Sequence, residues 1–140
     1  MRPLNSFMNR TQIHSRLSAV TSELLREKGF ISPVDVFVRM GYLDTKDHEA
    51  WRCGRIPHLE SAIRANLAKI SFVMATLRRN SLNGGLKPSW TAYHSWGKNG
   101  RKELRFSKSG LPHIEEAYAT HFVRRHSKVA DATQEAGNKS

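Results

Sequence analysis

The sequence contains little cysteine, few acidic side chains and no long apolar run. Its single cysteine, Cys53, excludes an intrachain disulfide and fits a reducing compartment. No segment approaches the roughly 18–20 apolar residues that a membrane-spanning helix needs. The first ten residues lack the apolar core of a secretory signal. We therefore expect a cytoplasmic protein that does not enter the membrane.

The shortage of acidic side chains leaves the chain strongly basic. Twenty-three Lys and Arg face 12 Asp and Glu, which gives a formal net charge of +11. The excess is greatest in residues 86–110, where Glu103 is the only acid among six basic side chains, Lys87, Lys98, Arg101, Lys102, Arg105 and Lys108. Such a cluster is typical of a surface that meets phosphate. Nucleic acid is the first candidate partner, and an acidic protein surface is the second.

The 140 residues are enough for one domain with its own core. We expect an N-terminal arm over residues 1–10 and a globular domain over 11–126. Residues 127–140 carry few large apolar groups and are typical of a disordered tail.

Helical periodicity covers the first 80 residues. A helix is expected over 11–28, where apolar residues recur at spacings of four, three and four, and Gly29 would end it. Ser32-Pro33 predicts the start of a second, short helix, and Asp44-Thr45 the start of a third with Trp51 as its buried anchor. A long helix is expected over 57–80, with one apolar face made by Leu59, Ile63, Leu67, Ile70, Met74 and Leu77.

The pattern then changes to that of a β-hairpin. Residues 90–96 and 104–107 are rich in aromatic and β-forming side chains, and Asn99-Gly100 favours a tight reversal between them. We expect Trp90 and Trp96 to be mainly core residues and Tyr93 to face solvent. A last helix is predicted from Pro112 to about residue 125. The fold class expected is mainly α with one β-hairpin, a helical bundle that carries a basic hairpin.

Two resemblances accompany this interpretation. Helices followed by a basic hairpin resemble the order of a winged helix-turn-helix, in which a recognition helix enters the major groove and the wing touches the backbone. Several segments are also similar to those of an uncharacterised family of bacterial proteins, namely ISPVDVFVRMGYL, WRCGRIPHLE, LKPSW, LRFSKSG and YATHFV. The second resemblance implies a bacterial origin and carries no activity with it.

The functional prediction is a non-catalytic nucleic-acid-binding protein, with regulation as its candidate role. Lys and Arg neutralise phosphates, and aromatic rings stack on unpaired bases. Tyr93 is the first candidate for stacking and Trp96 the second, with secondary contacts from Arg52 and from Arg78-Arg79. The predicted nucleic-acid-binding residues are Lys98, Arg101, Lys102, Arg105, Lys108, Tyr93, Lys87 and Arg55.

Two other classes of function remain open. The basic surface is equally compatible with an adaptor that docks on an acidic partner protein. A small metal-independent nuclease is a second alternative, because His94, Glu103, Arg105 and Tyr93 lie on adjacent predicted strands. No cofactor or metal is expected, since the seven histidines are scattered and none forms a His-x-x-x-His pair. DNA and RNA are not distinguished by the sequence.

Overall fold

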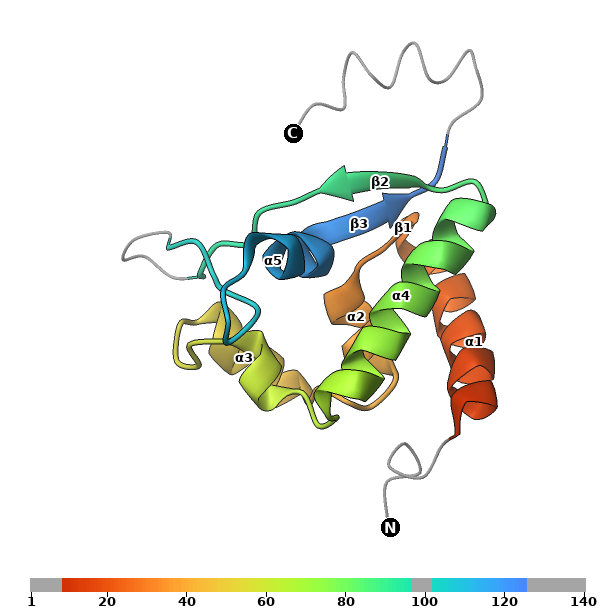
Figure 1. Cartoon of the computed structure of the whole chain (residues 1–140). Helices are drawn as coiled ribbons and strands as arrows, with labels where there is room; N and C mark the ends of the chain where they lie inside the picture. Colours follow the sequence, from red (N-terminus) through yellow and green to blue (C-terminus); the bar gives the residue numbers. More distant parts are fainter. Residues whose placement is uncertain (1–8, 97–101, 126–140) are drawn as a thin grey trace, which may run out of the picture.

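Helices pack against a small antiparallel sheet, as the computed structural model shows (Figure 1). It describes residues 9–96 and 102–125. In chain order the elements are α1 (Arg10–Lys28), β1 (Phe30–Ile31), α2 (Pro33–Arg39), α3 (Thr45–Arg52), the 3-10 helix η2 (Leu59–Ala62), α4 (Leu67–Asn83), β2 (Lys87–Trp90), α5 (Pro112–Ala119) and β3 (Thr120–Val123). The predicted fold class, mainly α with a β-hairpin, is confirmed.

The first helix has the bounds and the buried face that the sequence predicts. Asn9 accepts a hydrogen bond from the Gln12 amide at 2.8 Å, and the Gln12 side chain accepts one from the Asn9 amide, which completes a capping box. Gly29 ends the helix in the left-handed conformation at φ 81°. The buried residues repeat every three or four positions, at Ile13, Leu17, Val20 and Leu24.

The next two helices are also confirmed. Ser32 caps α2, because its hydroxyl accepts from the Asp35 amide at 3.1 Å, and Pro33 occupies the first helical position. Trp51 anchors α3 and is completely buried. Both helices are short, so their stability comes from packing rather than from intrinsic propensity.

The long helix predicted over 57–80 is wrong in its first half. Residues 58–60 instead pair with the segment at 105–106, where the Glu60 amide donates to the Phe106 carbonyl at 2.8 Å. The helix starts afresh at Asn66, whose side chain accepts from the Lys69 amide at 2.8 Å. Leu67, assigned to the apolar face, is 63% exposed.

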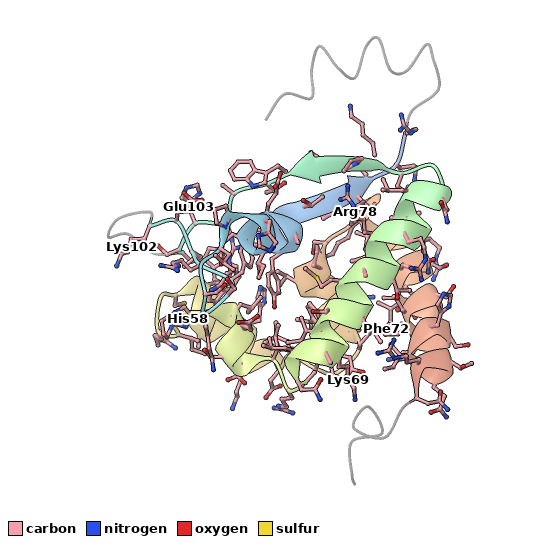
Figure 2. All side chains as sticks on the ribbon, in the orientation of Figure 1. His58, Lys69, Phe72, Arg78, Lys102 and Glu103 are labelled. Carbon is pink, nitrogen blue, oxygen red and sulfur yellow. The ribbon has the colours of Figure 1, made fainter. Side chains whose placement is uncertain are left out.

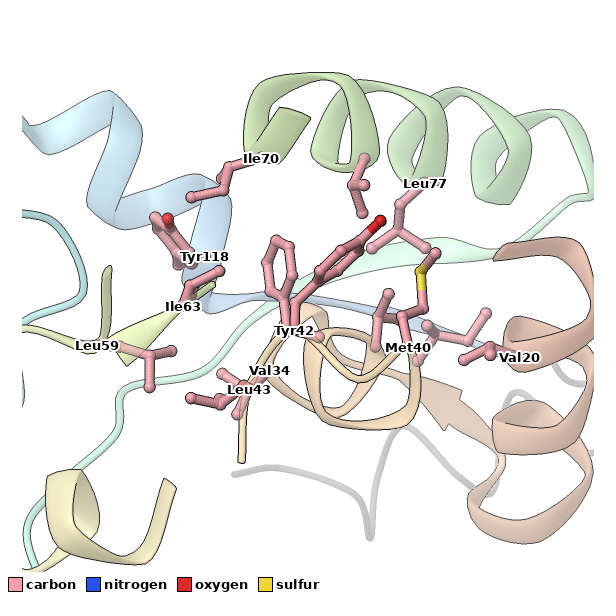
Figure 3. Packing of buried hydrophobic residues seen from close by; sticks show 14 of the residues in the cluster. Val20, Val34, Met40, Tyr42, Leu43, Leu59, Ile63, Ile70, Leu77 and Tyr118 are labelled. Atoms are coloured by element: carbon pink, nitrogen blue, oxygen red, sulfur yellow. The ribbon is translucent and has the colours of Figure 1, made fainter. Parts of the chain in front are cut away.

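The core lies between α1, α4 and the sheet. Figure 1 shows α1 and α4 side by side, with their C-terminal ends leading into β1 and β2. The two long helices contact each other directly. Figure 3 shows the buried side chains between them, including Val20 from α1, Leu77 from α4, Tyr118 from α5, and Met40 and Tyr42 from the turn after α2.

The last predicted helix is wrong beyond Ala119. The chain leaves α5 and becomes β3, the central strand of a sheet in the order β1-β3-β2. Thr120 to Val123 pair with Trp90 to Lys87 on one side, and Phe122 and Val123 pair with Ile31 and Phe30 on the other. The inward positions of Tyr118 and Phe122 are nevertheless as expected, at 1% and 3% exposure.

The hairpin is shorter and less regular than predicted. Strand β2 ends at Trp90 and pairs with β3, not with residues 104–107. Residues 93–95 and 102–104 do run antiparallel, joined by a bridge between His94 and Glu103. The Ser95 amide donates to the Lys102 carbonyl, and the Leu104 amide donates to the Tyr93 carbonyl, each at 2.8 Å. The predicted Asn99-Gly100 reversal lies outside the described residues, as do most of the N-terminal arm and the whole predicted tail.

Candidate nucleic-acid interface

The C-terminal turn of α3 is tied to the hairpin at two points. The indole N–H of Trp51 donates to the Arg105 carbonyl at 2.8 Å, and the Trp96 amide donates to the Arg52 carbonyl at 2.6 Å. His58, which follows the WRCGR turn, forms a parallel β-bridge with Arg105 of the hairpin. These bonds bring the WRCGR turn and the basic hairpin together, although they are far apart in the sequence.

The segments that these bonds join carry five cationic residues and form what we call the basic end: Arg52, Arg55, Lys102, Arg105 and Lys108. All are exposed except Arg52, which is half-buried. Figure 2 shows Lys102, Glu103 and His58 on the side of the molecule that carries α3 and the hairpin, away from Arg78 on α4. Four of the predicted site residues, Arg55, Lys102, Arg105 and Lys108, therefore lie on segments that the backbone bonds join.

Few acids neutralise the basic end. The salt bridges found in the described residues join Lys28, Arg39 and Arg64 to acids elsewhere. Glu115 is occupied by the Phe106 and Ser107 amides at 2.9 and 2.7 Å, and Glu60 accepts from the Lys108 amide at 3.0 Å. These two carboxylates hold the backbone of the 106–108 turn in place, and only the exposed Glu103 opposes the cations from within the hairpin.

The other predicted site residues do not join this cluster. Lys87 is exposed but pairs with Val123 at the opposite end of β2 from Trp90. Lys98 and Arg101 lie outside the described residues. The side chain of Arg105 lies against Gly110, whose φ of 70° and lack of a side chain leave it room.

Tyr93 does not face solvent, so that expectation is wrong. Its ring packs partly buried between Trp51 and Phe106, with ring centroids 5.7 and 5.2 Å away. The Tyr93 hydroxyl and Nε2 of His121 share a hydrogen bond of 2.9 Å. Burial raises the pKa of Tyr93 to about 12, so the phenol stays neutral.

The assignment of the two hairpin tryptophans to the core is also wrong. Trp90 is 58% exposed and Trp96 is 49% exposed. Large exposed aromatic side chains on a basic surface are available to stack on a ligand. The candidate for stacking therefore moves from Tyr93 to Trp96, whose ring also lies 4.8 Å from the Arg52 guanidinium.

Arg52, predicted only as a secondary contact, is the most unusual side chain of this region. Its guanidinium lies 4.9 Å from the Tyr93 ring centroid and 4.8 Å from that of Trp96. Its Nε is buried and has no hydrogen-bond acceptor, and no carboxylate of the described chain forms a salt bridge with it. The sequence signal for this arrangement is weak, because it depends on contacts between α3 and the hairpin.

Two histidines lie beside Arg52. The His48 ring packs edge-on to Trp96 at 6.2 Å, and the His121 ring stacks on Phe30 at 5.2 Å with parallel planes. Burial lowers the pKa of both imidazoles; the positive charge of Arg52 adds to the effect on His48. Both rings are therefore mainly neutral at neutral pH, and Nε2 of His121 is already engaged by the Tyr93 hydroxyl.

The four residues of the nuclease alternative do not converge on one point. Tyr93 is turned toward His121, while Arg105 lies against Gly110. His94 and Glu103 face each other across the hairpin and are exposed. Within residues 9–96 and 102–125, no three His, Cys, Asp or Glu side chains are grouped so that they could hold a metal ion.

Among the described helices, none has the length and apolar character needed to cross a membrane. No protein-family model, curated protein or solved structure matches this chain. Both resemblances, to a winged helix-turn-helix and to a bacterial family, therefore stay predictions. What the chain does has to be argued from its own geometry.

Proposed function

We propose that this protein is a non-catalytic nucleic-acid-binding protein that contacts phosphates through the basic end. The observation that carries the proposal is that Arg52, Arg55, Lys102, Arg105 and Lys108 lie on joined segments and have no salt-bridge partners in the described chain. Two nearby carboxylates, Glu60 and Glu115, could compete with phosphates for these cations. Both accept hydrogen bonds from backbone amides instead.

Phosphate binding by such a surface has a characteristic dependence on salt. Each neutralised phosphate releases condensed counterions, so the logarithm of affinity falls with the logarithm of salt by roughly 0.9 per contact on duplex DNA. The exposed ring of Trp96 adds a surface on which a base can stack. A bacterial, cytoplasmic and regulatory setting belongs to the same proposal.

The first test reverses two exposed charges that have no other role in the fold. In the variant Arg55→Glu/Lys102→Glu, binding to labelled DNA and RNA should weaken strongly, and the salt slope should fall by about 2. Fluorescence anisotropy across a salt series measures both quantities on nuclease-treated protein. Melting temperature should stay within a few degrees of the wild type, because both side chains are exposed.

The control variant is Arg78→Glu/Arg79→Glu, which makes the same charge change on the exposed side of α4. It should retain most of the affinity. A loss confined to the α4 variant would refute the basic end as the interface and favour the order of a winged helix-turn-helix, with α4 as recognition helix. Weak binding of the wild type to every nucleic acid would favour the adaptor alternative, an acidic partner protein.

A further inference from the structure

A cleft borders the basic end at Arg52. It has a volume of ≈ 330 Å³ and is bounded by α2, α3, β3 and the start of the hairpin. Its aromatic and cationic lining comes from Phe30, His48, Arg52, Tyr93, Trp96 and His121. Pockets of about 300 Å³ and above are of the size that holds a small ligand. One planar base with its sugar is a ligand of this scale.

The rings that line the cleft are held in place by one another. His121 is stacked on Phe30, and Tyr93 stands edge-on to His121 at 5.8 Å with planes 75° apart. The bond between the Tyr93 hydroxyl and His121 fixes the same pair. A wall that is already ordered loses little conformational entropy when a flat ligand binds against it.

Arg52 supplies the polar group of the cleft. The rings of Tyr93 and Trp96 pack against the guanidinium group of Arg52. The N–H groups at the edge of the guanidinium are therefore the part that can donate to an acceptor. The buried Nε has no partner, and a buried donor without an acceptor is uncommon in folded proteins. Carbonyl oxygens, ring nitrogens and phosphate oxygens of a nucleotide are acceptors of the right kind.

The charge around the cleft also favours this ligand. The carboxylate of Asp35, which lines it, is bound to Lys28 at 3.0 Å and is thereby neutralised. Arg52 lines the cleft, and the backbone of Lys102 is bonded to Ser95, next to Trp96 in the chain, so phosphates that flank an inserted base can meet cations of the basic end. A negatively charged strand with accessible bases therefore matches both the charge and the rings.

We propose that this cleft receives an unpaired base of a single-stranded nucleic acid, stacked beside Trp96 and contacted by Arg52. The inference rests on the proposed function and adds the class of ligand to it. A duplex keeps its bases paired and would have to unstack one to reach the cleft. Single strands present their bases freely and are the better ligand.

The test compares three ligands of equal length, oligothymidylate, an abasic strand with the same phosphates, and a blunt duplex, by fluorescence anisotropy. The wild type should bind oligothymidylate about 5- to 150-fold more tightly than the abasic strand, the range that one base–aromatic stack supplies. The variants Trp96→Ala and Arg52→Gln should each reduce this ratio toward one. Trp96→Ala should leave binding of the abasic strand nearly intact.

Trp90→Ala is the matched control. Trp90 is similar to Trp96 in exposure and lies six residues before it in the chain, but it does not line the cleft. It should keep the ratio of the wild type. Equal binding of oligothymidylate and the abasic strand would refute the proposal that the cleft receives a base, but it would leave the proposed phosphate interface intact. Loss of the ratio in Trp90→Ala alone would also overturn the proposal that the cleft receives a base. Failure of all three ligands to bind at physiological salt would refute the proposed function itself.

Discussion

At the scale of single residues, Trp51 decides where the hairpin lies. Its ring is completely buried among Tyr93 and Phe106, and its indole N–H holds the Arg105 carbonyl. The sequence predicts this anchor, because Trp51 is the one large apolar residue of a short, otherwise polar helix. The sequence does not show that Trp51 is buried while Trp90 and Trp96 are exposed, because the burial of each ring depends on its tertiary neighbours rather than on its own segment.

Substitution of Trp51 by Phe should lower the free energy of unfolding by about 2 kcal/mol. Roughly half of this loss comes from the hydrogen bond to Arg105 and half from the smaller ring. Urea unfolding followed by circular dichroism measures the change. Trp90→Phe, at a site 58% exposed, should shift stability by less than about 0.5 kcal/mol. Similar effects of the two substitutions would contradict the anchoring role of Trp51.

At the scale of elements, the sequence predicts those that local signals specify. Helices α1 and α2 carry their own side-chain caps, α3 begins after Asp44 without one, and all three start within a residue or two of their predicted positions. The misassigned segments are those that pair with distant chain. Residues 58–60 leave helical form to bond with 105–106, and residues 120–123 become a strand between β1 and β2. Only the β-branched and aromatic residues of Thr-His-Phe-Val hint at the strand.

The start of α4 depends on one local signal, Asn66. Because its side chain satisfies the Lys69 amide, Asn66→Ala should destabilise the protein by about 1 kcal/mol, while Asn66→Asp should retain most of the stability. Thermal unfolding of the two variants measures the difference. An unchanged melting temperature in Asn66→Ala would mean that packing of α4, rather than its cap, fixes where the helix begins.

At the scale of the whole molecule, the net charge is strongly positive and is distributed unevenly along the chain. The net charge of +11 makes the folded state repel itself, and acidification adds further positive charge. Burial has already lowered the pKa of His48 and His121 in the folded state. The unfolded chain, with histidine pKa values near 6.5, therefore takes up protons first as pH falls.

Stability should consequently be complete above about pH 6.5 and decline as pH falls from there toward the lowered pKa values of the folded state. Urea midpoints between about pH 7 and pH 5 measure this decline. His121→Gln, which removes one of the two half-buried imidazoles, should make the dependence shallower. Added salt should recover only the part that arises from self-repulsion. A midpoint that rises on acidification would contradict both causes.

The central position of β3 has a consequence for how the protein is made. The strand that lies between β1 and β2 is the last one described in the chain, and Arg124 beside it donates to the Leu25 carbonyl across 99 positions. During synthesis the earlier helices can form while the sheet still lacks its middle. The cleft is thus complete only after translation has passed residue 123, so an incomplete nascent chain carries the charges but not the finished cleft.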